Sequence, residues 1–456
     1  MLLRINVKNL YSFGEMKEFN MIPNSKYKRL NHHKYIRQDF EILKLSSIYG
    51  ANAAGKSNLV KSIKIVKDII EKEDIPNNID DIKYKFLNET DENSITIALE
   101  FYHSGKFFYY AIKIDGKVVL TEELYESGLG RKADLLIFER NTDRDGKTTL
   151  KFMRDFENDK ESQVLKNVIE KNLCKPNKSV MKLLTTLENK FLEDVSNAYN
   201  WFKDTLEIIR PSSKPRAIAH YMDLDEDFHE YAKNILCSFH VGIKDVSSEK
   251  KSYKKFFGNI KSKELNEALN SLEELPESYL KLGSSTYGEE LVIVKEKDDF
   301  MVKRLKLIHE GKNGKKAIFR IFNESDGTKR LLDFLPALRG VVNKEKVYII
   351  DEIERSIHPL LIKELVKKFS DDENTNGQLI FSTHESNLLD QNIFRPDEIW
   401  FAEKDLNGCT DLYSLSDFKE HSTIDIRKGY LSGRYGSIPF LGNIKELNWH
   451  NDDINK

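Results

Sequence analysis

The sequence predicts an α/β fold: a mixed β-sheet with flanking helices and a β-meander, interrupted by a mostly helical insertion. Short apolar runs at 347–350 and 379–381 are typical of strands buried on both faces of a parallel sheet, and residues 43–49 fit a strand that enters the core. Residues 94–125 alternate apolar and polar side chains between tight turns, as a meander does. Residues 155–280 hold charge-rich stretches with helical periodicity, which indicates the insertion.

The length of 456 residues, of which 39% are hydrophobic, indicates two or three globular domains. We expect an N-terminal lobe over 1–150, the helical insertion over 151–290, and a C-terminal lobe over 291–456. The 72 Lys and Arg residues balance 74 Asp and Glu residues. This balance excludes a uniformly basic coat for nucleic acid but leaves a local basic patch open.

The three cysteines, Cys174, Cys237 and Cys409, are far apart and form no CxxC pair. This usage predicts a reducing, cytoplasmic compartment, with neither a disulfide framework nor a zinc site. The first ten residues lack the apolar region of a secretory signal. No stretch approaches the ~18 continuous apolar residues of a membrane-spanning helix, so we expect no membrane association.

The N-terminal region is predicted to deliver a strand directly into a glycine-rich loop. Residues 1–22 read as two strands with a turn at 12–15, and 23–40 read as a polar loop. The strand at 43–49 enters the core, and a helix follows the loop. Its apolar residues recur at helical spacing: Leu59, Val60, Ile63, Val66, Ile69 and Ile70.

The loop Gly50-Ala51-Asn52-Ala53-Ala54-Gly55-Lys56-Ser57 fits the pattern G-x-x-x-x-G-K-[ST], with a strand before it and a helix after it. Glycines let the backbone turn its N–H groups toward phosphate oxygens, and the helix adds the positive end of its dipole. We expect Lys56 to reach the β- and γ-phosphates of ATP and Ser57 to ligate Mg²⁺. The predicted nucleotide contacts are Gly50, Asn52, Ala53, Ala54, Gly55, Lys56, Ser57 and Asn58.

Two acidic residues, Asp351 and Glu352, follow the apolar run 347–350. A buried parallel strand delivers such residues to the carboxyl edge of its sheet, where ligands bind. We expect Asp351 to hold Mg²⁺ and Glu352 to act as the general base toward water. Alone, the pair could equally be two acids ending a strand at the surface. The phosphate loop favours the functional interpretation.

His384 follows the next apolar run, 379–381. At the same sheet edge, a histidine can donate a hydrogen bond to the γ-phosphate and respond to its loss. A histidine at a strand end is more often structural, so this assignment depends on the other motifs.

A second anion site is predicted at Ser325 and Gly327, just before a helical stretch that holds Leu331, Leu332, Leu335 and Leu338. A bound nucleotide needs only one phosphate-binding loop on each of its two sides. The simplest arrangement is therefore a head-to-tail homodimer, in which the Ser325–Gly327 loop of one subunit closes over the γ-phosphate held by Lys56 of the other. The alternative is an ordinary helix N-cap.

In chain order these motifs resemble the ABC-type P-loop ATPases of the SMC/RecF-like branch. Within it the chain is similar to the stand-alone bacterial AAA_15/AAA_21 ATPases, through the form of Glu324–Arg330 and the segment Gly433–Pro439. The resemblance implies ATP hydrolysis in a dimer or higher oligomer. It also implies a role in abortive infection, as for the AriA subunit of the PARIS anti-phage system and the OLD proteins. The implied partners are a separate nuclease or toxin effector and a phage trigger protein.

The chain departs from the family pattern in two ways. Asp326 replaces a glycine common in transporter members, and no Q-loop glutamine can be placed. OLD proteins carry a nuclease domain with an Asp-x-Asp triplet after the ATPase. Here Asp223-Leu224-Asp225 lies upstream and none follows His384. We therefore expect any nuclease on a partner chain.

An SMC/RecF-like ATPase that binds DNA for repair is the alternative function. It depends on residues 244–263, where seven lysines alternate with Tyr253, Phe256 and Phe257. A solvated charged face is the more common explanation of such a run. A transporter ATPase is a third reading, which the form of Glu324–Arg330 and the large insertion disfavour.

Overall fold

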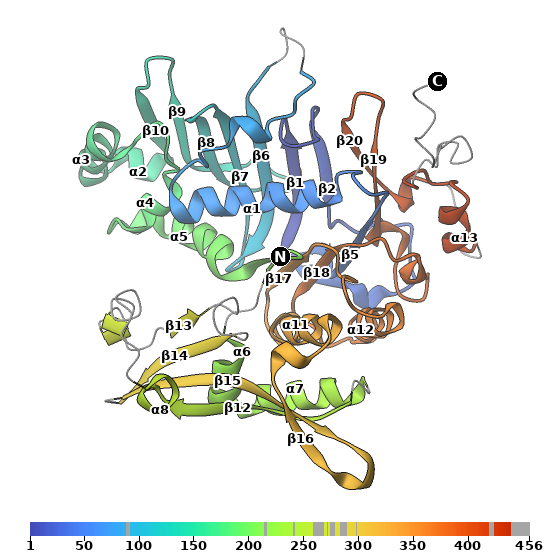
Figure 1. Cartoon of the computed structure of the whole chain (residues 1–456). Helices are drawn as coiled ribbons and strands as arrows, with labels where there is room; N and C mark the ends of the chain where they lie inside the picture. Colours follow the sequence, from blue (N-terminus) through green and yellow to red (C-terminus); the bar gives the residue numbers. More distant parts are fainter. Residues whose placement is uncertain are drawn as a thin grey trace, which may run out of the picture. The chain divides into compact units, whose positions relative to one another are not determined.

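The chain folds into two compact units in the computed structural model (Figure 1). The first unit comprises Met1–Ile209, Glu345–Ile353 and Lys367–Lys456, and the second comprises Arg210–Lys344 and Glu354–Val366. The structure describes all residues except 88–91, 214–216, 240–241, 259–268, 271, 274–278, 283–289, 298, 419–423 and 439–456.

A six-stranded sheet in the first unit carries the predicted motifs. Its order is β11-β17-β18-β5-β19-β20; the first five strands are parallel and β20 is antiparallel to β19. Every residue of β5, β17 and β18 is buried. The apolar runs of β17 and β18 predicted this burial, whereas β5 also buries two serines, Ser46 and Ser47. The strands are β11 (Leu206–Ile209), β17 (Val347–Ile350), β18 (Gln378–Ser382), β5 (Leu45–Tyr49), β19 (Ile399–Lys404) and β20 (Thr410–Ser414).

A seven-stranded antiparallel sheet of order β10-β9-β8-β7-β6-β1-β2 completes the first unit. It contains the predicted meander, extended by two further strands. Within the predicted loop 23–40, β3 (Lys34–Arg37) forms a small hairpin with β4 (Phe40–Leu43), a pairing too short to be visible as periodicity. The seven strands are β1 (Leu2–Lys8), β2 (Lys17–Asn20), β6 (Ile95–His103), β7 (Lys106–Asp115), β8 (Val118–Glu126), β9 (Leu135–Thr142) and β10 (Thr148–Phe152).

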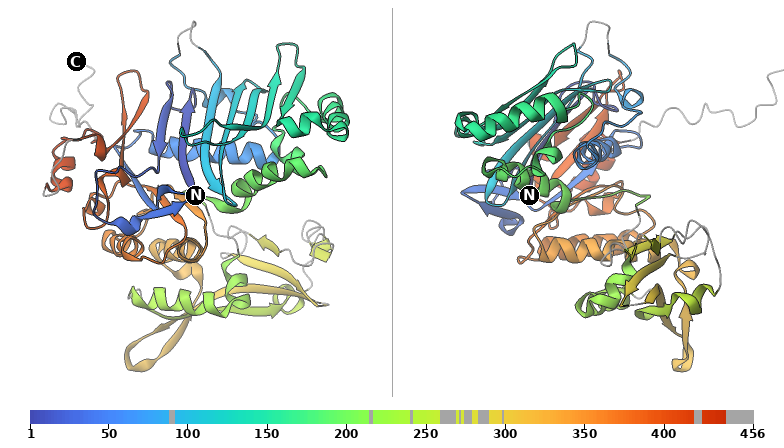
Figure 2. Two further views of the ribbon diagram at one scale, coloured as in Figure 1. Left: turned by 180° about the vertical axis from the view of Figure 1, so that it is seen from behind. Right: turned by 90° about the vertical axis from the view of Figure 1, so that its left-hand side faces the viewer.

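Helix α1 (Lys56–Lys72) lies across the antiparallel sheet in both views (Figures 1 and 2). The six apolar residues predicted on one face of this helix are buried in the same core as the strands of both sheets. Trp201 is fully buried beside them and stacks on Phe101 with 4.1 Å between ring centroids. The remaining helices here are α2 (Arg154–Asn158), α3 (Lys160–Val168), α4 (Met181–Thr185), α5 (Glu193–Asn200) and α13 (Ile426–Leu431).

The second unit differs from the predicted helical insertion. The helices predicted for 151–290 are present up to Thr205 and again at α6 (Ile218–Leu224) and α7 (Glu226–Ser238), but β12 and β13 were not predicted there. These two strands belong to a sheet of order β12-β15-β14-β13, with β16 paired to β15. Strand β12 was missed because its exposed face is polar and only Ile243 and Val246 are buried. The strands are β12 (Ile243–Ser252), β13 (Tyr279–Leu282), β14 (Leu291–Glu296), β15 (Asp299–Glu310) and β16 (Lys316–Phe319).

The predicted lobe boundaries at 150 and 290 also differ from the two units. Helices α2–α5 belong to the first unit, whereas β14, β15 and the helix after Ser325 belong to the second. No helix in the described part of the chain has both the length and the apolar content to cross a bilayer. The second unit's helices are α6 (Ile218–Leu224), α7 (Glu226–Ser238), α8 (Tyr253–Phe257), α11 (Asp326–Asn343) and the start of α12 (Pro359–Asp371).

A buried lysine ties the strand before the phosphate loop to the end of α12. The Nζ of Lys44 donates to the backbone carbonyls of Phe369, Ser370 and Asp372 at 3.2, 3.0 and 2.7 Å. Burial lowers the pKa of Lys44 to about 8. These carbonyls end a helix and have no partner within it, so the lysine acts as their cap.

Lys44→Met should lower the free energy of unfolding by about 2–4 kcal/mol, because the buried carbonyls lose their donor. In the folded chain the pKa of Lys44 lies near 8, and its ordinary value is 10.5. The unfolded chain therefore binds more protons between these values, and the stability gap between wild type and variant should widen as pH rises through this window. Urea unfolding against pH measures both effects. Lys151→Met, at an exposed lysine of β10, is the control. Equal losses of unfolding free energy in the two variants would refute the role of Lys44 as the cap of α12.

Candidate nucleotide-binding site

Three predicted motifs meet at one edge of the six-stranded sheet. The loop Gly50–Ser57 follows β5, Asp351 and Glu352 follow β17, and His384 follows β18 closely. These strands are parallel neighbours in the order β17-β18-β5. Their carboxyl ends therefore lie side by side, at the position where ligands bind in parallel sheets.

Gly55 is required by both backbone conformation and space. Its φ is 113°, and a Cβ there would lie 2.1 Å from Oγ1 of Thr410. The Gly55 carbonyl accepts the first helical bonds, from the N–H groups of Asn58 and Leu59. Asn52 and Ala53 are exposed at the crest of the loop. The loop therefore presents its crest outward at the N-terminus of α1, the geometry that binds phosphate.

The ammonium of Lys56 is buried, with only 4% of the residue exposed. It donates to the carbonyl oxygens of Gly50 and Ala51 at 2.8 and 3.1 Å. It also lies 3.4 Å from Nδ1 of His384. The structure thus brings together the predicted phosphate-binding lysine and the predicted γ-phosphate sensor.

Ser57 and Asp351 meet at the same point. Ser57 Oγ donates to Asp351 Oδ1 at 3.0 Å, and Ser382 Oγ donates to the same oxygen at 2.6 Å. A hydroxyl and a carboxylate are the hard oxygen ligands that Mg²⁺ prefers, with phosphate oxygens and water supplying the rest. The described residues contain no group of three or more His, Cys, Asp or Glu arranged to hold a metal. A Mg²⁺ site shared with a nucleotide needs no such group, so the residues present fit this ion.

Glu352 takes a left-handed backbone conformation, with φ of 50°. Its N–H donates to Ser382 Oγ at 2.9 Å, so one serine hydroxyl contacts both acidic residues. This conformation costs a non-glycine residue about 1 kcal/mol and is concentrated at functional sites. No local sequence pattern predicted the left-handed conformation of Glu352 or the two hydrogen bonds that Ser382 makes with the acidic pair.

A second polar network supports the phosphate loop. Thr410 Oγ1 donates to the Ala54 carbonyl at 2.9 Å and lies 2.6 Å from Ser12 Oγ. The amide of Asn58 donates to Ser12 Oγ at 2.8 Å. Asn58 was predicted to contact the nucleotide; in the structure its amide supports the loop through Ser12. Ser12 and Thr410 escaped prediction because they are isolated polar residues at opposite ends of the chain.

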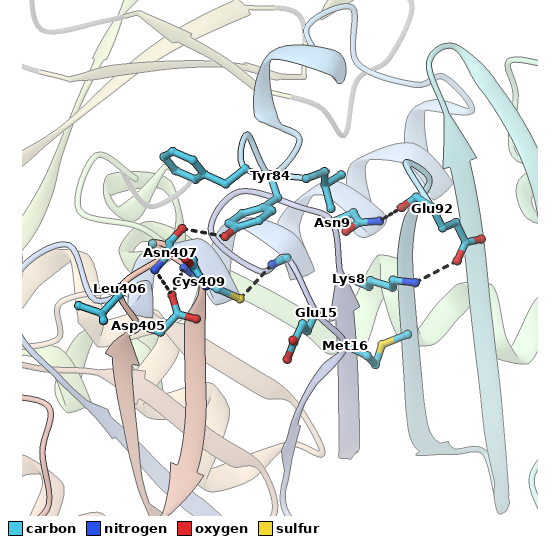
Figure 3. Close-up of a pocket in the computed structure, with 14 residues that line it drawn as sticks. Lys8, Asn9, Glu15, Met16, Tyr84, Glu92, Asp405, Leu406, Asn407 and Cys409 are labelled. Atoms are coloured by element: carbon cyan, nitrogen blue, oxygen red, sulfur yellow. Dashed lines mark hydrogen bonds and ion pairs between the residues drawn. The ribbon is translucent and has the colours of Figure 1, made fainter. Parts of the chain in front are cut away.

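A cavity of about 1060 Å³ is lined in part by Gly14 and Cys409, which are close in sequence to Ser12 and Thr410 (Figure 3). Its walls come from the segment after β1, the segment around Tyr84, and the β19–β20 turn. Tyr84 donates to the Asn407 carbonyl at 2.8 Å, and the Gly14 N–H donates to Cys409 Sγ at 3.3 Å. Carboxylates outnumber cations on the walls, so the cavity does not suit phosphate groups. The charged lining residues are Lys8, Glu15, Glu92 and Asp405.

Ser325 and Gly327 lie in the second unit, at the start of α11. Ser325 is the N-cap, and its Oγ accepts from the Thr328 N–H at 3.1 Å. A Cβ at Gly327 would lie 2.6 Å from the Ser356 carbonyl, so this position needs glycine. The N-cap alternative is therefore confirmed, and the exposed helix start keeps the geometry of an anion site. A contact between these residues and a nucleotide stays a prediction.

In the described part of the basic stretch, residues 244–258, the aromatic side chains pack inward and do not form a surface for base stacking. Phe257 is buried, and Tyr253 and Phe256 pack against the same core. Lys250 pairs with Asp223 and Glu296, and Lys251 with Glu249. Residues 259–263 lie outside the described part of the chain.

The terminal segment Gly433–Pro439 packs on β19 as far as it is described; Pro439 lies outside that range. Tyr435 is 1% exposed and stacks on Phe401 with ring centroids 5.6 Å apart. Its carbonyl accepts a hydrogen bond from the Tyr413 hydroxyl at 2.8 Å. The segment therefore packs against side chains of β19 and β20.

A family model described as "AAA domain, putative AbiEii toxin, Type IV TA system" matches residues 188–390, which include Ser325, Asp351, Glu352 and His384. No curated protein matches the chain. This match and the strand order support an ABC-type P-loop ATPase.

Solved structures similar to this chain include SMC head domains, at TM-scores too low to carry an argument. An SMC head bound to the C-terminal winged-helix domain of ScpA is 12% identical, with TM-score 0.43, 91% of this chain covered and 97% of that chain. The SMC head domain from Thermotoga maritima is 12% identical, with TM-score 0.38 and coverage of 91% and 98%. A head with an extended coiled coil, bound to the C-terminal domain of ScpA derived from Pyrococcus furiosus, is 13% identical, with TM-score 0.40 and coverage of 95% and 98%.

Thr410→Val should weaken ATP binding about tenfold, because the isosteric side chain leaves the Ala54 carbonyl and Ser12 without their partner. Titration with a fluorescent ATP analogue measures the affinity. Thr149→Val, at an exposed threonine of β10, should bind as wild type does. An unchanged affinity in Thr410→Val would show that the network does not hold the loop.

Proposed function

We propose that this chain is the ATP-binding and ATP-hydrolysing subunit of a bacterial abortive-infection system that acts against phage in the cytoplasm. It assembles as a homodimer or higher oligomer and controls a separate effector, such as a nuclease, in response to a phage component. The observation that carries the ATPase assignment is the convergence of Lys56, Ser57, Asp351, Glu352 and His384 at one sheet edge. The description of the matched family as a toxin of a type IV system supports the defence setting.

In this proposal each residue has one task. Lys56 leaves the carbonyls of its own loop and binds the β- and γ-phosphates. Ser57 and Asp351 hold Mg²⁺, which when bound neutralises charge on the phosphates. Glu352 orients the attacking water and accepts its proton. His384, beside Lys56, donates a hydrogen bond to the γ-phosphate.

The active assembly needs a second subunit. Ser325 and Gly327 begin a helix with exposed residues at its start, and Lys56 already has a complete phosphate loop of its own. We assign Ser325 and Gly327 to the γ-phosphate bound by another copy. Nucleotide state then controls association, because the γ-phosphate is the shared ligand. An effector held by the assembly would be held or released as that ligand is hydrolysed.

Glu352→Gln should keep ATP binding, lower hydrolysis about 100-fold or more, and accumulate dimers in ATP and Mg²⁺, because the base is lost while the phosphate contacts remain. Lys56→Ala should lose ATP binding and stay monomeric. Phosphate release and light scattering after gel filtration measure the two properties. Glu364→Gln, at an exposed residue of α12, is the matched control. Normal turnover by Glu352→Gln would refute the assignment of the base.

A further inference from the structure

A two-stranded arm projects from the sheet of the second unit (Figure 1). The arm, residues 307–323, consists of the end of β15, a turn, β16 and the 3₁₀ turn Ile321–Asn323. Its strands pair from Leu307 with Phe319 to Glu310 with Lys316. Strand β12 follows β15 only as far as His309, so the tip extends beyond the sheet.

The surface of the arm combines positive charge with large apolar side chains. All residues from 310 to 319 are exposed; Lys312, Lys315 and Lys316 stand against Glu310 alone. Three apolar residues are also exposed: Ile318 by 59%, Phe319 by 38% and Phe322 by 52%. Exposed aromatic and aliphatic groups with a charged rim are characteristic of a protein interface.

The outer edge of β16 pairs with no other strand in the described part of the chain. Such an edge is a template for an added strand. The three lysines disfavour a second copy of the chain there, because two arms would bring like charges together. The same lysines attract an acidic strand. The charge pattern therefore selects an acidic partner over self-association.

Nucleic acid fits the arm less well. Three lysines can neutralise about three phosphates, which gives weak and strongly salt-dependent binding. Contacts of this kind leave Ile318, Phe319 and Phe322 in water. A protein segment can cover the apolar groups and meet the lysines at once.

The base of the arm contacts the residue before Ser325. His309 Nε2 lies 2.7 Å from Glu324 Oε1, and the His309 ring packs on Phe319 with centroids 4.4 Å apart. The Glu324 side chain is only 6% exposed. A ligand that pairs with β16 therefore acts on residues joined directly to the predicted γ-phosphate loop.

We propose that the arm binds an extended acidic segment of a partner protein, which adds a strand to the outer edge of β16 and places its carboxylates on Lys312, Lys315 and Lys316. Binding is transmitted to the Ser325 loop through His309 and Glu324. The identification of the partner as the controlled effector rests on the proposed function. Binding itself is measured without nucleotide, so its failure is distinguishable from failure of the ATPase assignment.

Selection of short random peptides on the full chain tests the docking surface. Enriched peptides should alternate acidic with apolar residues. They should lose about tenfold or more in affinity for Lys312→Glu/Lys315→Glu/Lys316→Glu and for Ile318→Ser/Phe319→Ser. Leu224→Ser, at an exposed leucine of the same unit, should bind them as wild type does.

Three outcomes overturn the proposal: no peptide is enriched, the enriched peptides lack acidic residues, or they bind the triple charge-reversal variant equally well. A short DNA duplex that binds through the lysines when no peptide does also overturns it, since the arm would then contact nucleic acid.

A second experiment tests the coupling between the arm and the Ser325 loop. A selected peptide should change the wild-type ATPase rate about twofold or more and leave the rate of Glu324→Gln unchanged, although it still binds that variant. An equal change in the ATPase rates of wild type and Glu324→Gln would refute transmission from the arm through Glu324.

Discussion

The arrangement of this molecule depends on the parallel pairing of β17, β18 and β5. The pairing puts the ends of three strands from opposite parts of the chain at one edge, although Ser57 and Asp351 are 294 residues apart. Asp351 links the ends of these strands, because its carboxylate accepts hydrogen bonds from the hydroxyls of Ser57 and Ser382. Lys44, at the start of β5, holds the same strand to the end of α12. The phosphate loop is therefore positioned by long-range contacts, whereas its shape is set locally by Gly55.

The sequence predicted what local chemistry determines. The runs before Asp351 and His384 are apolar because their strands are buried on both faces, and that burial is visible without a structure. The helix after Lys56 was equally clear from its apolar spacing. Ser382, Ser12 and Thr410 could not be found, since a lone hydroxyl gains its role only from partners that the fold brings to it. Strand β12 was hidden for a related reason: β15 completes it, and its own sequence is polar.

The two units carry complementary parts of one proposed cycle. The first holds the phosphate loop and the acidic residues, and the second holds Ser325 and the arm that precedes it. Within the second unit, the start of α11 packs closely on the segment after the acidic pair, because a Cβ at Gly327 would lie 2.6 Å from the Ser356 carbonyl. A partner on the arm reaches the same helix through Glu324. In the proposed cycle, the second unit therefore carries both the Ser325 loop assigned to the γ-phosphate and the arm that binds the partner.

The sharing of one nucleotide by two copies is the central claim, and mixed assemblies test it most directly. Lys56→Ala subunits and Ser325→Arg subunits should each be inactive alone. In an equal mixture, each mixed dimer holds one intact site of two, so hydrolysis should return to about a quarter of the wild-type rate if subunits pair at random and to about half if only mixed dimers form. A mixture as inactive as its separate components, with mixed dimers demonstrated by differently tagged subunits, would contradict the account.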